Sequence, residues 1–233
     1  MAGTPPDESQ SPEDSVDITI SNVVSHFSVR CHLNLRTIAT NGSNVVYQRE
    51  QSIILMKLRT PQVTASIWSS GKIVCTGASS EEQAKSASRR VARVLQRMGF
   101  RVKFSSYRVV NVLGTCRMPF GIKIGEFSTA HRQVASYEPE LHPGATYRMK
   151  ELKAVLKIFQ TGSITITAPS VQNVQLAVEH IYPLVYEFRK PKPLGYADNH
   201  LCSHDAEDID DSLKQYDKLL IDKAGSTSSS DSE

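Results

Sequence analysis

The sequence contains no run of about 18 consecutive apolar residues, the length that a membrane-spanning helix requires, so we expect no membrane partner. It has only four cysteines, Cys31, Cys75, Cys116 and Cys202, which lie far apart with no C-x-x-C pair. That spacing favours reduced thiols over a zinc site or a disulfide framework. The N-terminus is acidic and rich in Pro and Ser, whereas a signal peptide would be basic and then apolar. We therefore expect an intracellular protein.

Signatures of catalysis are missing as well. The seven histidines follow no motif, and the sequence has no glycine-rich phosphate loop. His200-x-x-x-His204 beside Cys202 has the residue types of a metal tract, but it falls in a segment whose composition indicates disorder. We expect no enzymatic activity, no cofactor, no metal and no small-molecule substrate.

The net charge of +3 hides an uneven distribution. Residues 1–17 contain five acids and no base, and residues 191–233 contain ten acids and four bases. The segment 18–190 is left with 23 Lys and Arg against 9 Asp and Glu, a net charge of +14. A basic segment between acidic tails is typical of a protein with a polyanionic partner such as nucleic acid, although a merely soluble basic domain has the same composition.

An internal repeat is the most informative feature. Asn22-Val-Val recurs as Asn111-Val-Leu, and the hairpin sequence at 67–76 recurs at 158–167, so the offset grows from 89 to 91 residues. Two half-domains, 18–104 and 105–190, are each too small to bury much surface alone, and we expect them to pack as one pseudo-two-fold unit. We interpret 1–17 and 191–233 as acidic, mostly disordered tails, with a short helix at 211–221 as the one exception.

The same elements are predicted in each half: a strand, a short helix, a three-stranded meander and a long closing helix. In half one they are strand 18–27, helix 33–39, strands 53–58, 63–68 and 72–76, and a helix from the capping box of Ser80 and Gln83 to Gly99. Half two has strand 108–116, helix 124–130 and a helix from Ser170 that Pro183 should kink.

Alternation of side chains assigns the two faces of the sheet. Ile73, Cys75, Ile164 and Ile166 share one face and must pack under the helices. The opposite face is small, polar and open. An antiparallel sheet with helices on one face only forms a binding platform.

Two segments give the sequence a specific resemblance. SSGKIVCTGASSEEQAKSASRRVARVLQRMGF (69–100) and SYEPELHPGATYRM (136–149) are similar to segments of the TATA-box-binding protein (TBP) family, and the similarity extends over about residues 17–190. The resemblance implies an α+β saddle with a pseudo-two-fold repeat, a curved ten-stranded antiparallel sheet and helices on the convex face. It implies a nuclear initiation factor for RNA polymerase II, with a cytoplasmic pool allowed, that contacts the minor groove of double-stranded DNA.

The resemblance also assigns a DNA-contacting face. The central asparagines of the family correspond to Asn22 and Asn111. The full candidate face is Asn22, Val24, Gln51, Arg59, Trp68, Lys72, Val74, Thr76, Asn111, Leu113, His142, Arg148, Phe159, Thr165 and Thr167.

The four positions that hold apolar wedges in the family are only half apolar here. They fall on Gln51, Trp68, His142 and Phe159, one polar and one aromatic residue in each half. A wedge stabilises the complex by burying apolar surface at about 25 cal/mol per Å². Gln and His instead lose hydration, at roughly 1–3 kcal/mol each. This pattern resembles the metazoan TBP-like branch of the family and predicts weak or no affinity for TATA boxes.

Surfaces for protein partners are implied too. Glu138, Glu140 and Leu141 match the family's contact with general transcription factor IIB. The edge strand Asn44, Val45, Val46, Tyr47, Gln48, Arg49 and Glu50 matches the contact with factor IIA. Lys85, Arg89, Arg93 and Arg97 match a basic helix that meets acidic regulators, although a solvated basic face would have the same spacing.

Two other functions remain open at this point. The chain could sequester factors IIA and IIB without touching DNA. It could bind single strands by stacking bases on Trp68 and Phe159. Saddle-like sheets also occur in DNA glycosylases, but no sequence remains for the helical catalytic domain that such an enzyme needs.

Overall fold

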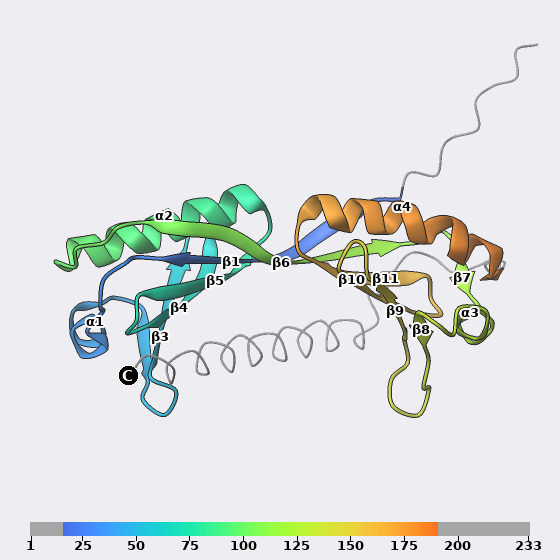
Figure 1. Cartoon of the computed structure of the whole chain (residues 1–233), viewed down its shortest axis with the longest axis horizontal. Coiled ribbons are helices and arrows are strands. Elements are labelled where there is room, and N and C mark those ends of the chain that lie inside the picture. The colour runs from blue at the N-terminus through green and yellow to red at the C-terminus, as the bar shows by residue number, and fades with distance from the viewer. Residues whose placement is uncertain (1–15, 191–233) are drawn as a thin grey trace, which may run out of the picture. The chain divides into compact units, whose positions relative to one another are not determined.

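Ten strands of the chain pair into one antiparallel sheet in a computed structural model that describes residues 16–190 (Figure 1). The order across the sheet is β2-β3-β4-β5-β1-β6-β11-β10-β9-β8. Half one supplies β1 (Ile18–Ser28), α1 (Leu35–Asn41), β2 (Val45–Gln48), β3 (Ile53–Arg59), β4 (Gln62–Trp68), β5 (Lys72–Ala78) and α2 (Glu81–Arg97). Half two supplies β6 (Ser105–Arg117), β7 (Gly121–Ile122), α3 (Ile124–Ala130), β8 (Ala135–Ser136), β9 (Ala145–Met149), β10 (Ala154–Ile158), β11 (Ser163–Ala168), α4 (Val171–Glu187) and β12 (Arg189–Lys190).

The two halves meet at β1 and β6, the long central strands. Their antiparallel pairing runs from Ile18 opposite Cys116 to Ser28 opposite Ser105. On either side of this pair the remaining strands follow in mirrored order. The predicted fold class, a ten-stranded antiparallel sheet built from two repeats, is confirmed.

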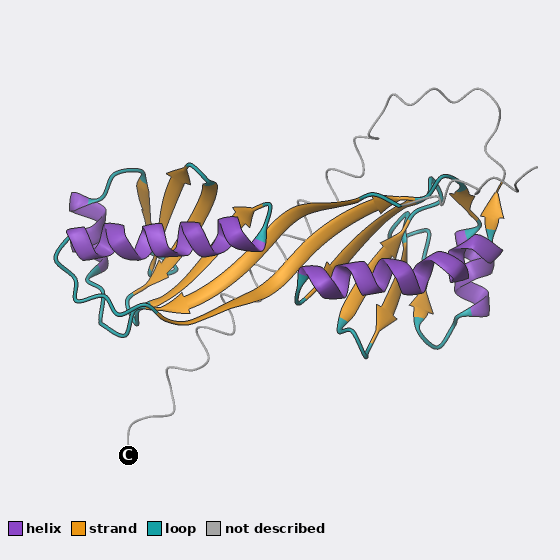
Figure 2. Ribbon diagram, turned by 90° about the horizontal axis from the view of Figure 1, so that it is seen from above, coloured by secondary structure: helices purple, strands orange, loops and turns teal. Residues whose placement is uncertain are grey.

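Helices α2 and α4 lie across the same face of the sheet, one over each half (Figure 2). Four residues at the centre of their apolar stripes are fully buried: Val91 and Leu95 on α2, and Val174 and Ile181 on α4. The alternate strand positions Ile73, Cys75, Ile164 and Ile166 are buried under them, as the period of two predicts. The core therefore lies between the helices and one sheet face.

Two helix details differ from the sequence predictions. Helix α1 begins at Leu35 instead of Leu33, because Asn34 caps it by accepting from the Thr37 N–H at 3.2 Å. Ser80 Oγ accepts from the Gln83 N–H at 3.1 Å, but Gln83 Oε1 binds the Ser79 hydroxyl at 3.0 Å instead of returning to the Ser80 backbone. Helix α4 has Ser170 as its N-cap and contains Pro183, as predicted, and it ends at Glu187.

A contact between the closing helices also joins the halves. Glu81, at the start of α2, accepts a hydrogen bond from the backbone N–H of Val171, the first residue of α4, at 3.2 Å. The first N–H groups of a helix have no partner inside it, and a carboxylate there is stabilised by the helix dipole. Glu81 therefore helps to fix α4 relative to α2.

None of the helices in residues 16–190 is both long enough and apolar enough to cross a membrane. The possible metal tract at His200, Cys202 and His204 and the possible helix at 211–221 lie outside the described residues.

Replacing the capping residue of either long helix should destabilise the protein. Ser80→Ala and Ser170→Ala each remove a side-chain acceptor for a helix N–H, 3.1 Å from Gln83 N and 3.2 Å from Asn173 N. We expect each to lower the free energy of unfolding by about 1 kcal/mol, measured by urea denaturation. Ser86→Ala, at an exposed position inside α2, is the matched control and should cost nothing. Equal effects of all three substitutions would contradict the capping assignment.

Candidate nucleic-acid interface

The sheet face opposite α2 and α4 is concave, because the outer strands of both halves bend away from the helices (Figure 1). We call it the concave face. Pairing across the strands places Thr64 beside Thr76 in half one and Lys157 beside Thr165 in half two on this face. These positions alternate with the buried residues of the core, so one strand period produces both surfaces.

Four of the predicted contact residues lie at the middle of the concave face, on β1 and β6. Asn22 pairs with Leu113, and Val24 pairs with Asn111, so the four positions are related by the pseudo-two-fold symmetry. Each keeps at most 5% of its surface exposed. Val74 is buried as well, at 7%, while Lys72, Thr76, Thr165 and Thr167 are partly exposed.

The amide of Asn22 has a fixed orientation. Its Oδ1 accepts a hydrogen bond from the backbone N–H of Gly77 at 2.7 Å. Because a backbone N–H needs an acceptor, the oxygen must point to Gly77 and the NH₂ group must point away. Asn22 therefore offers donors, which match the acceptors on A·T base edges in a minor groove.

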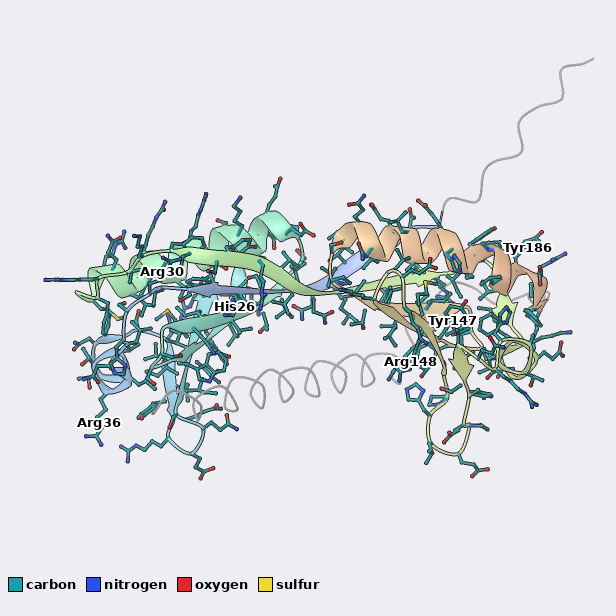
Figure 3. The ribbon with its side chains drawn as sticks, viewed as in Figure 1. His26, Arg30, Arg36, Tyr147, Arg148 and Tyr186 are labelled. Carbon is teal, nitrogen blue, oxygen red and sulfur yellow. The ribbon has the colours of Figure 1, made fainter. Side chains whose placement is uncertain are left out.

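More basic side chains lie on the concave face than the sequence analysis assigned to it. Arg59 and Arg148 are exposed, as predicted, and Arg148 projects from β9 (Figure 3). Four further basic side chains lie opposite residues of this face on the neighbouring strands, and the sequence did not point to them: Lys57, Arg108, Arg117 and Lys157. Two of these four could have been predicted from the alternation of side chains along a strand. Lys57 follows the core residue Met56, and Lys157 lies between the core residues Leu156 and Ile158.

These charges affect a histidine on β1. His26 pairs with Arg108 on one side and with Val74 on the other. Burial lowers the pKa of His26, and the positive charges of Arg108 and Lys72 lower it further. A neutral imidazole at neutral pH leaves the positive potential of this face to its Lys and Arg side chains.

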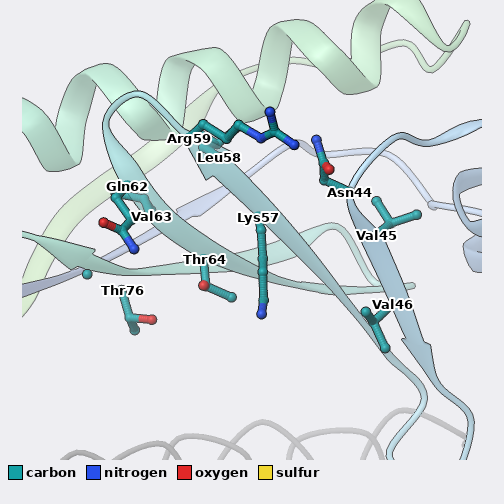
Figure 4. Close-up of a pocket in the computed structure, with 11 residues that line it drawn as sticks. Asn44, Val45, Val46, Lys57, Leu58, Arg59, Gln62, Val63, Thr64 and Thr76 are labelled. Atoms are coloured by element: carbon teal, nitrogen blue, oxygen red, sulfur yellow. The ribbon is translucent and has the colours of Figure 1, made fainter.

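A hollow of about 680 Å³ opens on the concave face of half one (Figure 4). Its lining includes Lys57 and Arg59 together with the hydroxyl groups of Thr64 and Thr76 and the amide of Gln62. Cations beside hydroxyl and amide groups are the side chains that bind a sugar–phosphate backbone. The hollow is therefore suited to a nucleic-acid strand.

The two wedge positions of half one lie at the end of the concave face. Gln51 is exposed in the turn between β2 and β3. Trp68 ends β4, pairs with Ile53 and is partly exposed. An indole in this position can stack on a base, while the Gln51 amide cannot serve as an apolar wedge.

At the corresponding place in half two, Phe159 departs from the prediction. It keeps only 6% of its surface exposed, so it is not a free-standing wedge. The His142 ring lies over it with 5.9 Å between ring centroids. Gly144 allows this close approach, because a Cβ there would lie 3.0 Å from the Phe159 ring and 3.1 Å from His142. The loop 142–144 therefore covers the aromatic ring.

His142 is held by polar contacts as well. Lys157 Nζ lies 3.2 Å from His142 Nε2, and His142 Nδ1 lies 3.1 Å from the Gly144 carbonyl oxygen. The Gly144 backbone N–H donates to His142 Nδ1 at 2.8 Å, so this nitrogen is an acceptor and the loop backbone holds the ring in place. Half two thus presents a cation and an imidazole where half one presents an amide and an indole.

Matched turns place the two aromatic residues. The Gly71 N–H binds the Trp68 carbonyl at 3.0 Å, and the Gly162 N–H binds the Phe159 carbonyl at 3.1 Å. Gly71 and Gly162 have φ of 80° and 91°, a conformation that favours glycine. A Cβ on them would lie 2.5 Å from the Cys31 carbonyl oxygen and 2.3 Å from that of Phe120.

The predicted protein-contact residues lie at the surface of the structure. Strand β2 forms one edge of the ten-stranded sheet, and its Val46 is 53% exposed. Glu138 and Glu140 are exposed in the turn before β9, and Leu141 is 80% exposed. Lys85, Arg89, Arg93 and Arg97 are exposed on α2.

Metal-binding groups do not gather within residues 16–190, where no three His, Cys, Asp or Glu side chains form a possible metal site. Cys75 and Cys116 are free and buried. Burial raises the pKa of Cys75 to about 11 and that of Cys116 to about 12, so both thiols are protonated at neutral pH. A protonated thiol is a poor metal ligand.

Comparisons with known proteins agree on one family. The family model described as transcription factor TFIID (or TATA-binding protein, TBP) matches residues 17–98 and 106–188. The chain is 60% identical over 176 residues to TATA box-binding protein-like 1 of Danio rerio, a match that covers 76% of this chain and 95% of that protein. It is also similar to the solved structure of Methanococcus jannaschii TBP, with a TM-score of 0.65 and 28% identity over 73% of this chain and 99% of that one.

Replacing the turn glycines should destabilise the protein. Gly71→Ala and Gly162→Ala each place an alanine at a positive φ, which costs about 1–3 kcal/mol of backbone strain. The new Cβ also lies too close to a backbone carbonyl oxygen. We expect each to lower the free energy of unfolding by at least that amount in urea denaturation. Gly125→Ala is the matched control, because a Cβ there meets nothing within 4 Å and alanine favours a helix. Loss of stability in the control alone would refute the assigned role of the turns.

Proposed function

The chain belongs to the TATA-binding protein family, and from that premise we propose that it initiates transcription by RNA polymerase II at promoters that lack a TATA box. It is a TBP-like transcription factor and not an enzyme. In this proposal it binds the minor groove of double-stranded DNA with weak or no TATA affinity, assembles with factors IIA and IIB, and acts in the nucleus.

The replacement of apolar wedges by polar side chains is the observation on which the proposal depends. Gln51 and His142 occupy wedge positions, and Phe159 lies beneath the His142 ring. Of the four positions, only Trp68 offers a partly exposed aromatic surface. Unstacking a base step costs a few kcal/mol, which a buried apolar wedge offsets and a desolvated amide does not. The basic side chains still favour DNA, because phosphate contacts are independent of sequence.

Electrophoretic mobility assays on promoter duplexes test the proposal directly. We expect a ternary complex of the chain, duplex DNA and factor IIA, and similar affinities for duplexes with and without a TATA box. Absence of any DNA complex under every combination of factors would refute DNA binding. It would support the second candidate function, in which the chain sequesters factors IIA and IIB.

Sequestration has its own support in the structure, since the polar wedge positions coexist with exposed protein-contact residues at Leu141 and Val46. Single-strand binding has less support, because Phe159 is 6% exposed and a stacking platform needs accessible rings. Acidic regulators are proposed to bind Lys85, Arg89, Arg93 and Arg97, which form an exposed row on α2.

Restoring the wedges should create TATA affinity. The double substitution Gln51→Phe and His142→Phe replaces two desolvated polar groups by apolar rings. We expect TATA-box affinity to rise by roughly two to four decades, measured by fluorescence anisotropy at fixed salt. The matched control is Gln172→Phe with His180→Phe, which makes the same replacements at exposed positions of α4. An unchanged affinity in the wedge variant would show that the wedges do not set the preference.

Factor IIB binding should depend on Leu141. This residue is 80% exposed, and the Glu138 carbonyl fixes its turn by accepting from the Leu141 and His142 N–H groups, both at 3.0 Å. An exposed leucine on a rigid turn is suited to a pocket of a partner protein. We expect Leu141→Ala to weaken factor IIB binding at least about ten-fold in a calorimetric titration. Leu176→Ala, 41% exposed on α4, should leave it unchanged, and equal losses would place the contact elsewhere.

A further inference from the structure

The two central asparagines of the concave face are held differently, although the sheet places them symmetrically. Asn22 is paired with Leu113 and Asn111 with Val24. Asn22 Oδ1 is bound to the Gly77 N–H at 2.7 Å. Within residues 16–190, the side chain of Asn111 makes no hydrogen bond.

A β-bulge in half one is the cause. The pairing of β5 with β1 shifts register between Val23, opposite Ala78, and Ser25, opposite Cys75. Gly77 lies in this bulge at φ 105° and turns its N–H toward Asn22. The ladder loses its regular spacing at a bulge, which frees a backbone group for another partner.

Half two has no such bulge. The pairing of β11 with β6 is regular from Ser163 opposite Arg117 to Ala168 opposite Val112. Ala168 follows Thr167 as Gly77 follows Thr76. An alanine does not readily adopt the φ of Gly77, so the sequence itself prevents the same bulge in half two. Asn111 therefore has no counterpart of the Gly77 N–H.

The difference changes what each amide can offer a base pair. Asn22 directs its oxygen at the Gly77 N–H, so the side of the amide that points away from Gly77 carries the NH₂ donors. Asn111 can turn either its oxygen or its NH₂ group outward. Within the described residues, the polar atoms that are fully buried without a partner belong to His26 and Tyr107, so the small exposed part of Asn111, 5% of its surface, includes its amide.

Base pairs also differ in the hydrogen-bond donors and acceptors that they present in the minor groove. A·T and T·A show only acceptors there, and G·C adds the N2 amino donor of guanine. A fixed donor meets the guanine amino group donor against donor and leaves both unpaired. A free amide can instead rotate and accept from it.

We propose that Asn111 is a specificity-determining residue that lets half two accept a G·C pair, while Asn22, locked by Gly77, restricts half one to pairs with acceptors only. The proposal rests on the proposed DNA-binding function and deepens it. Because the halves read the groove unequally, the protein binds in one orientation on a site with a single central G·C pair.

Three duplexes with one palindromic sequence of base pairs test this, because the two binding orientations then differ only in where a guanine amino group lies. The first has only A·T and inosine·cytosine pairs, and inosine lacks the guanine amino group. The second has guanine in place of one central inosine, and the third has it at both symmetric positions. Affinities of the full chain are measured by anisotropy in the presence of factor IIA.

We expect one guanine to change Kd less than about three-fold, because the protein places that guanine under Asn111. Two guanines should weaken binding at least about ten-fold. Asn111→Ala should make the first guanine as costly as the second. Asn22→Ala removes the fixed donor from half one, so it should keep the tolerance of one guanine and lower the cost of the second.

Equal losses for the first and second guanine in the unaltered chain would overturn the inference and leave DNA binding intact. Tolerance of one guanine in Asn111→Ala would overturn the assignment to Asn111. Failure to bind all three duplexes would overturn the proposed DNA-binding function, and this inference with it. The duplex series on the unaltered chain needs no variant, so a misfolded variant cannot obscure the result.

Discussion

The antiparallel pairing of β1 with β6 is the interaction on which the rest of the structure depends. Each half contributes five strands to the large sheet and has one long helix, and a half of that size buries little apolar surface alone. Joining the halves makes one continuous sheet, with the central strand of each half covered on both edges. The same pairing sets Asn22 and Asn111 at the centre of the concave face, so the stability of the fold and the geometry of the candidate site have a common origin.

Much of the fold follows from local sequence patterns. The repeat predicted two like halves, and the alternation along 72–76 and 163–167 correctly separated core from concave face, because the side-chain period of a strand is a property of the backbone. The start of α2 was predictable from Ser80, since capping involves only neighbouring residues. The ends of other elements were harder to predict. Helix α1 begins two residues later than predicted, because the side chain of Asn34 caps it.

What the sequence did not reveal depends on contacts between distant segments. The burial of Phe159 requires the loop at 142–144 to fold back onto it, and no local pattern encodes that approach. The bond between Asn22 and Gly77 joins residues that are 55 positions apart. The separate pairing of β7 with β12 joins residues at the two ends of half two. Contacts between distant segments determine which side chains of the site are buried or hydrogen-bonded, whereas local patterns already determine which sheet face is open. The location of the site was therefore easier to predict than the state of its side chains.

The unequal edges of the large sheet have a consequence for higher-order assembly. At one end β2 has four residues and an exposed valine, while at the other β8 has only two residues. A strand of two residues offers too few backbone groups to template an additional strand. Of the two edges of the sheet, β2 is therefore the one with enough backbone groups to pair with an added strand.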